Sequence, residues 1–221
     1  MNKRLLILFW IGFALSNAVY GQGYEHTFVF LNSKPDKEAL SEAVVDALMT
    51  GHLANIDSLV SQGKLLVAGP FDGGGGIFIL STGSLTEARA WLSTDPAIQA
   101  DRWDVEMYPF AVSEGKICTP SEPYEMVTYN FVRFIAHNEI ANYKMSGASE
   151  TEPSAIEVIQ QLKAAGDLLI ECDFANDDGG IFIYKGDNRS QLIDKDPSVQ
   201  NGEVDVAYKS IWLTLGSFCE P

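Results

Sequence analysis

The feature of this sequence that most constrains its fold is an internal recurrence. The segment QGKLLVAGPFDGGGGIFIL at 62–80 returns in altered form as AGDLLIECDFANDDGGIFIY at 165–184. The Asp-Pro pair at 95–96 returns at 196–197, 101 residues further along the chain. Two tandem copies of one unit therefore make up most of the chain, and both copies are expected to fold in the same way.

Residues 1–21 have the layout of a secretory signal peptide and are not expected to belong to the fold. Lys3 and Arg4 precede an apolar run over 5–15, and small residues precede an expected cut after Gly21. The apolar run is shorter than the roughly 20 residues that span a bilayer. We therefore expect export to the periplasm or the extracellular space, with no membrane attachment after cleavage; a retained N-terminal anchor is the alternative.

The charge of the chain narrows its expected partners. The formal net charge is −15, and cleavage of the signal peptide would remove two positive charges and no negative ones. Such a surface repels nucleic-acid backbones and anionic membranes, so neither is expected as a partner. With 46% hydrophobic residues the chain has enough apolar side chains to form a core. A small-molecule ligand is the expected partner, and self-association stays open.

The first copy, expected at 22–114, has the apolar pattern strand, helix, strand, strand, helix, strand. Strands are expected at 26–31, 64–68, 77–80 and 105–112, and helices at 40–48, 52–60 and 84–92. Gly51 is expected to divide the first helical region, so that His52 begins its second piece. Asp95-Pro96 is expected to end the last helical region. The order is that of a ferredoxin-like, split βαβ unit.

The second copy, expected at 125–221, repeats this order after a proline-containing linker at 115–124. Its strands are expected at 127–136, 168–172, 181–184 and 204–215, and its helices at 156–162 and 190–193. A four-stranded sheet with helices on one face leaves the other face apolar. Two such sheets facing each other bury both faces, so the sequence predicts an α+β fold in which the two repeats pack as a sandwich or barrel within one chain.

The cysteines have two expected roles. Cys118 and Cys219 each follow the last expected strand of their copy, 101 residues apart. A disulfide between them is one alternative and two separate thiols the other, because the sequence does not show whether the Cα atoms come within about 7 Å. Cys172 lies within an expected strand and is interpreted as a small buried hydrophobic residue.

Several short motifs of the first copy occur in the order and spacing of the YciI-like proteins, whose shared unit is the YCII-related domain. The motifs are His52-Leu53, Gly63-Lys64-Leu65-Leu66, Gly69-Pro70, Asp95-Pro96 and Pro109-Phe110. The sequence resembles this family over most of the first copy and, more weakly, over most of the second. The resemblance implies a dimeric α+β barrel and an acid/base pair in a cleft. That pair would be His52 and Asp95, with Gly69 and Pro70 shaping the wall of the substrate site.

The second copy keeps the aspartate of this pair but not the histidine. Counting back eleven residues from the glycine that ends the helix gives His52 in the first copy and Ala155 in the second. Asp196 remains, and an aspartate before a proline also has a structural use at a helix end. We therefore expect any chemistry in the first copy and a packing role for the second.

Two functions are compatible with this pattern. A histidine beside a carboxylate can act as a base at neutral pH, because the carboxylate fixes the ring tautomer and stabilises the imidazolium. In a half-buried cleft, such a pair can abstract a proton next to a carbonyl, as in an isomerase or lyase. The alternative is a non-catalytic small-molecule binding or interaction module, in which His52 only packs and Asp95 only marks a helix end.

Other motifs do not point to chemistry. The glycine run at 73–76 precedes a strand and not a helix, so it is expected to be a hairpin turn and not a phosphate-binding loop. The histidines show no paired ligand spacing, so neither a metal nor a cofactor is expected. Trp91, Trp103 and Trp212 are expected to pack in the core or at its rim.

Overall fold

The computed structural model describes residues 23–136 and 155–219. The expected signal peptide at 1–21 and His137 lie outside these residues. Within them, no helix is long and apolar enough to cross a membrane.

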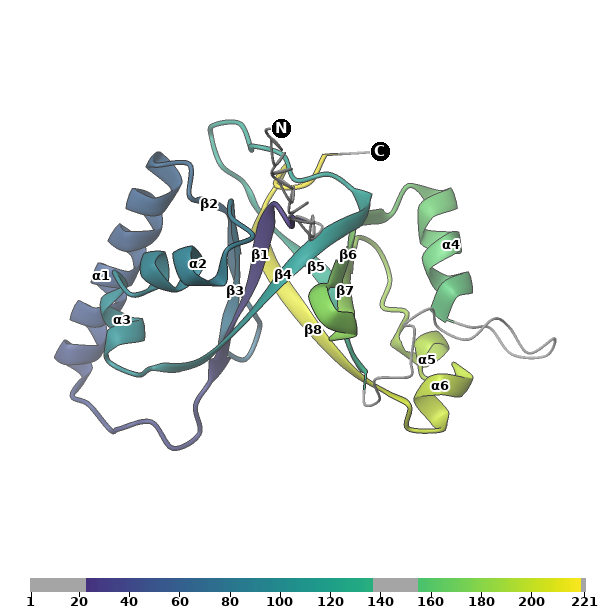
Figure 1. Cartoon of the computed structure of the whole chain (residues 1–221), viewed down its shortest axis with the longest axis horizontal. Helices are drawn as coiled ribbons and strands as arrows, with labels where there is room; N and C mark the ends of the chain where they lie inside the picture. The colour runs from purple at the N-terminus through teal and green to yellow at the C-terminus, as the bar shows by residue number, and fades with distance from the viewer. Residues whose placement is uncertain (1–22, 137–154, 220–221) are drawn as a thin grey trace, which may run out of the picture.

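The same order of strands and helices occurs in both halves of the chain (Figure 1). The first half contains β1 (His26–Ser33), α1 (Glu42–Ser61), β2 (Leu65–Pro70), β3 (Gly76–Leu80), α2 (Leu85–Leu92), α3 (Pro96–Gln99) and β4 (Trp103–Gly115). The second half contains β5 (Met126–Ala136), α4 (Ala155–Ala165), β6 (Leu168–Phe174), the 3₁₀ turn η1 (Ala175–Asp177), β7 (Gly180–Tyr184), α5 (Ser190–Ile193), α6 (Pro197–Gln200) and β8 (Val204–Thr214).

The eight strands form one antiparallel sheet in the order β2-β3-β1-β4-β6-β7-β5-β8. The halves join where β4 pairs with β6, from Phe110 opposite Phe174 to Gly115 opposite Ile170. The fold is therefore α+β, as expected, but the sheet is continuous across the two halves, whereas the sequence predicts two separate sheets. The reason is that β4 is long enough to continue past its own half and reach β6.

The sheet also curls, so that its two outer strands meet. Phe71, directly after β2, forms a single β-bridge with Ile211 of β8, and the backbone N–H of Asp72 donates to the Ser210 carbonyl. Apart from this bridge, β2 and β8 show no ladder pairing among the described residues. One junction between the halves is thus a strand ladder with one irregularity between Val112 and Glu114, while the other has a single bridge at one end.

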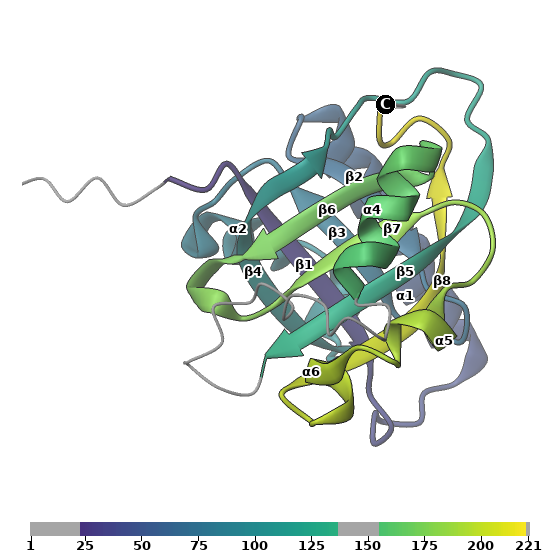
Figure 2. The same cartoon turned by 90° about the vertical axis from the view of Figure 1, so that its right-hand side faces the viewer.

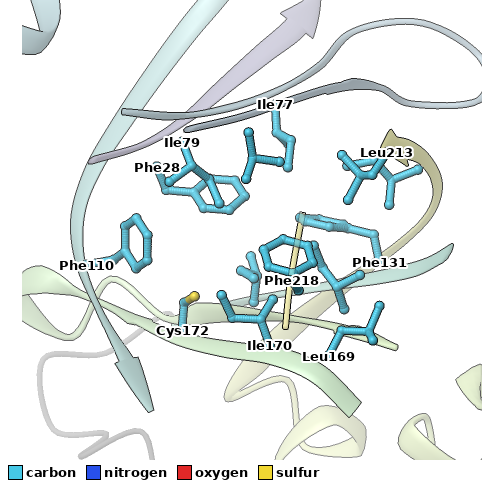
Figure 3. Packing of buried hydrophobic residues seen from close by; sticks show 14 of the residues in the cluster. Phe28, Ile77, Ile79, Phe110, Phe131, Leu169, Ile170, Cys172, Leu213 and Phe218 are labelled. Atoms are coloured by element: carbon cyan, nitrogen blue, oxygen red, sulfur yellow. The ribbon is translucent and has the colours of Figure 1, made fainter. Parts of the chain in front are cut away.

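The curled sheet encloses the main core (Figure 3). Phe28, Ile77 and Ile79 of the first half face Phe131 and Leu213 of the second, and all are at most 2% exposed. Each fully buried side chain of this size contributes about 1.5–3 kcal/mol to folding. The two halves therefore share one core, and neither buries its inner face alone.

The helices cover the outer faces of the sheet, with α1 to α3 on the first half and α4 to α6 on the second (Figures 1 and 2). They pack to different degrees. Helix α4 buries four side chains, those of Ala155, Val158, Ile159 and Leu162. The longer helix α1 buries only His52 and Leu59. This loose packing leaves space between α1 and the sheet.

Two expectations about the first helical region are wrong. Gly51 does not divide the region, because α1 runs unbroken for 20 residues and His52 lies in its middle. One internal glycine costs only about 1 kcal/mol relative to alanine, which the rest of such a helix outweighs. Gly51 instead lets α3 approach, since a Cβ there would lie 2.6 Å from Pro96 Cγ. Asp95-Pro96 does not end a helix; it begins α3.

A disulfide joins Cys118 to Cys219, whose Cα atoms are 5.3 Å apart. It ties the segment after β4 to the segment after β8, which also share a β-bridge between Ile117 and Phe218. Cys172 is a free, buried cysteine of β6, and burial raises the pKa of its thiol well above the ordinary value. Its interpretation as a small core residue agrees with this position.

Candidate functional site

The structure brings His52 and Asp95 together. Nδ1 of His52 lies 2.6 Å from Oδ2 of Asp95, and the two side chains are only 9% and 1% exposed. His52 comes from the middle of α1 and Asp95 from the residue before α3. Their approach depends on Gly51, where α1 has no side chain to hold α3 away.

Asp95 is fixed by the helix that it precedes. Its Oδ1 accepts hydrogen bonds from the backbone N–H groups of Ala97 and Ile98, at 2.8 and 3.3 Å. This is an N-cap, which satisfies N–H groups that would otherwise lack a partner at the start of α3. One carboxylate oxygen is thus used in capping, and the other is held toward His52.

The imidazole of His52 is held between two aromatic rings. The Phe78 ring lies nearly parallel to it at 5.9 Å between centroids, and the Trp103 ring lies tilted at 4.8 Å. Because an ionised carboxylate only accepts hydrogen bonds, Nδ1 carries the proton and Nε2 carries a lone pair. No hydrogen bond reaches Nε2 from the described residues, so this nitrogen is available to a ligand.

His52 lines a cavity of about 880 Å³ between α1 and the sheet. The wall on the α1 side includes the apolar Met49, Leu53 and Ile56 and the carboxylate-bearing Asp57. Leu53 lines this cavity and is 59% exposed, which is a large fraction for a leucine. A largely apolar pocket with a few polar side chains, here His52 and Asp57 among them, is typical of small-molecule sites.

The cavity continues around β2 to the junction with β8. Gly69 and Pro70, predicted to shape the site, both line it. Gly69 also has a packing reason, because a Cβ there would lie 2.2 Å from the Trp212 carbonyl oxygen. From Gly69 toward Leu66, away from the bridge at Phe71, β2 and β8 separate, and Leu66 and Thr214 line the space between them.

The segment after β4 closes this side of the cavity. Ile117, Cys118, Thr119 and Tyr124 are among its lining residues. The disulfide from Cys118 to Cys219 therefore holds a wall of the candidate site in place.

The second half has a different arrangement at the equivalent place. Asp196 caps α6 through Oδ1, which accepts from the backbone N–H and the hydroxyl of Ser198. Its Oδ2 accepts from the backbone N–H of Ala155, at 2.8 Å. The residue that the sequence aligns with His52 therefore contacts the equivalent aspartate, but through its backbone.

Sequence reasoning missed the aromatic and apolar neighbours of His52. Trp103 is expected only as a packing residue, yet it contacts the His52 ring and lines the cavity. No local pattern marks it, since it opens a strand far from His52 in the sequence. Met49, Leu53 and Val60 carried a usable signal, because apolar residues four and seven positions apart lie on one face of a helix.

The described residues contain no group of three or more His, Cys, Asp or Glu side chains placed to hold a metal ion.

Comparisons with known proteins identify one domain. No curated protein matches the sequence. A solved structure of a proposed monooxygenase from Fusobacterium nucleatum is similar at 8% identity and a TM-score of 0.42, over 86% of this chain and 94% of that one. The model of the YCII-related domain matches residues 27–111. These residues hold both His52 and Asp95, and the chain thus contains a YCII-related domain in its first half.

Proposed function

We propose that the first half binds a small carbonyl compound and acts on it as an isomerase or lyase, with His52 as the base and acid. The observation that carries this proposal is the contact between His52 Nδ1 and Asp95, which leaves Nε2 available at the cavity. Asp95 is the positioning residue, because it fixes the ring tautomer and stabilises the imidazolium.

The chemistry follows from this arrangement. Nε2 removes a proton from a carbon next to the carbonyl, and the C–H electron pair becomes the C=C bond of an enolate whose charge rests on oxygen. In an isomerase, His52 returns the proton to another carbon. In a lyase, the enolate expels a group from the next carbon, and His52 protonates that group. Proton transfer by a positioned side chain supplies about 10²–10⁴-fold acceleration.

We also propose that the chain arose by tandem duplication of a ferredoxin-like unit, with repeats at 22–114 and 125–221. Three observations support this. The element order is shared, the strand order β2-β3-β1-β4 corresponds to β6-β7-β5-β8, and the capping aspartates occupy matching positions. The Cys118–Cys219 disulfide supports export, because such bonds persist mainly in oxidising compartments.

A non-catalytic binding module is the second candidate. The specific observation in its favour is the packing of His52 between Phe78 and Trp103, which would hold the ring in place without any reaction. In that case the apolar cavity binds a ligand and releases it unchanged.

Exchange of ligand hydrogen for solvent deuterium distinguishes the two candidate functions. The protein is incubated in deuterated water with a panel of small ketones and lactones, and deuterium uptake next to the carbonyl is followed by NMR. Uptake by the native protein that falls by about 10²-fold or more in His52→Gln, with ligand affinity retained, supports catalysis. Circular dichroism checks that the variant folds. Binding without uptake by the native protein contradicts catalysis and favours the binding module.

A further inference from the structure

A second, smaller cavity lies directly beside the one that His52 lines. Its volume is about 200 Å³, and it shares three lining residues with the larger cavity: Met49, Gly75 and Trp103. Trp103 also contacts the His52 ring. The two cavities therefore share walls, and one of these walls, Trp103, lies against the acid/base pair.

The small cavity differs from the large one in charge. Lys37 and Arg102 line it, whereas the large cavity has no lysine or arginine among its lining residues. Two cations beside one cavity are notable in a chain of net charge −15. They come from separate segments, one before α1 and one before β4.

Within the described residues, neither of these two cations forms an ion pair. Arg102 donates from one guanidinium nitrogen to the Glu38 carbonyl oxygen at 2.7 Å, which fixes its head group and leaves further N–H groups. The carboxylates of Asp101 and Asp104, which flank Arg102 in the sequence, pair with Lys34 at 2.6 and 3.6 Å. A carboxylate of a ligand can therefore bind both cations, and an arginine matches its geometry well.

We propose that the substrate is a carboxylic acid with an apolar body, whose carboxylate binds Lys37 and Arg102. The apolar body fills the large cavity, and the atoms between the two ends pass Trp103 beside His52. A carbonyl a few bonds from the carboxylate then lies at the base, so γ-keto acids are the class that fits. The position of the carbonyl rests on the proposed function, whereas the binding of the carboxylate does not.

The test compares γ-oxodecanoate with its uncharged methyl ester by calorimetry at low ionic strength and neutral pH. The variant is Lys37→Gln with Arg102→Gln. The control is Lys185→Gln with Lys195→Gln, which removes the same charge from the second half. We expect the acid to bind the native protein about tenfold more tightly than the ester, a difference typical of charge-assisted hydrogen bonds. The variant should lose that difference, and the control should keep it.

Three outcomes overturn the inference: equal affinity for acid and ester in the native protein, an equal loss of acid binding in variant and control, or no binding of either probe at millimolar concentration. Deuterium uptake next to the keto group is measured in the same samples. Selective binding of the acid without uptake supports the carboxylate site and contradicts the acid/base function. The two proposals can therefore fail separately.

Discussion

Asp95 and Asp196 occupy equivalent places in the two halves, and each uses one carboxylate oxygen to cap a short helix. The partner of the other oxygen differs: the imidazole of His52 for Asp95, and the backbone N–H of Ala155 for Asp196. The Asp-Pro motif therefore has a structural role in both halves, where it begins a short helix. Whether it also supports chemistry depends on the side chain that the neighbouring helix presents.

The helices that contact these aspartates also differ in how they pack on the sheet. Among the described residues, helix α4 packs the apolar side chains of Ala155, Val158, Ile159 and Leu162 onto the sheet. Helix α1 extends ten residues before His52 and leaves a cavity beneath it. Each half thus gains a helix cap from its aspartate, and in the first half the same aspartate also contacts an imidazole beside a cavity.

The largest expected effect concerns activity. Asp95→Asn should lower deuterium uptake by about 10²–10⁴-fold, because an amide no longer stabilises the imidazolium and can favour the other tautomer. Asp196→Asn should leave the uptake within about twofold, as assessed at the concentration of folded protein. Equal losses in the two variants would remove the functional difference between the halves.

The next effect concerns stability, in which the two aspartates should differ far less than in activity. Asp196→Ala should lower the free energy of unfolding by roughly 3–5 kcal/mol, because it leaves buried N–H and hydroxyl donors of Ala155 and Ser198 without an acceptor. Asp95→Ala should cost a similar amount, because it removes the acceptor of the Ala97 and Ile98 backbone N–H groups and of the His52 Nδ1–H. Urea unfolding monitored by circular dichroism measures both. A loss for one variant several times larger than for the other would mean that only one of the two aspartates is a main structural residue.

The smallest effect concerns an ion pair between the halves. Burial alone would raise the pKa of Glu106 on β4, but hydrogen bonds from Arg133 of β5, Tyr108 and Asn32 outweigh burial and lower this pKa. A lowered pKa in the folded state stabilises the protein above the unfolded value of about 4.3, and the stabilisation is lost as pH falls through the folded pKa.

Because Glu106 is 37% exposed, its contribution should be about 1 kcal/mol or less. Glu106→Gln should therefore reduce stability slightly at pH 7 and flatten the decline of stability below about pH 4. Unfolding curves at a series of pH values measure this. An unchanged pH dependence would show that the pair does not contribute to the contact between the halves.

Much of the local structure could be predicted from the sequence, because it depends on short-range patterns. Aligning the sequences of the two copies matches Ala155 with His52, and each of these residues contacts the aspartate of its own half. Gly51 was misinterpreted because its role depends on Pro96, which α3 brings to it from far along the chain. The pairing of β4 with β6 and the contact of Trp103 with His52 likewise depend on tertiary packing, which no local pattern encodes.

The unequal junctions between the halves have a consequence for how such a fold can change. In a symmetric homodimer the two contacts between subunits are related by a twofold axis, so every substitution alters both together. Here both halves belong to one chain, and one contact is a strand ladder while the other has a single bridge and lines a cavity. A mutation can widen the open junction without weakening the closed one. Binding specificity and structural integrity can therefore be altered independently in this molecule.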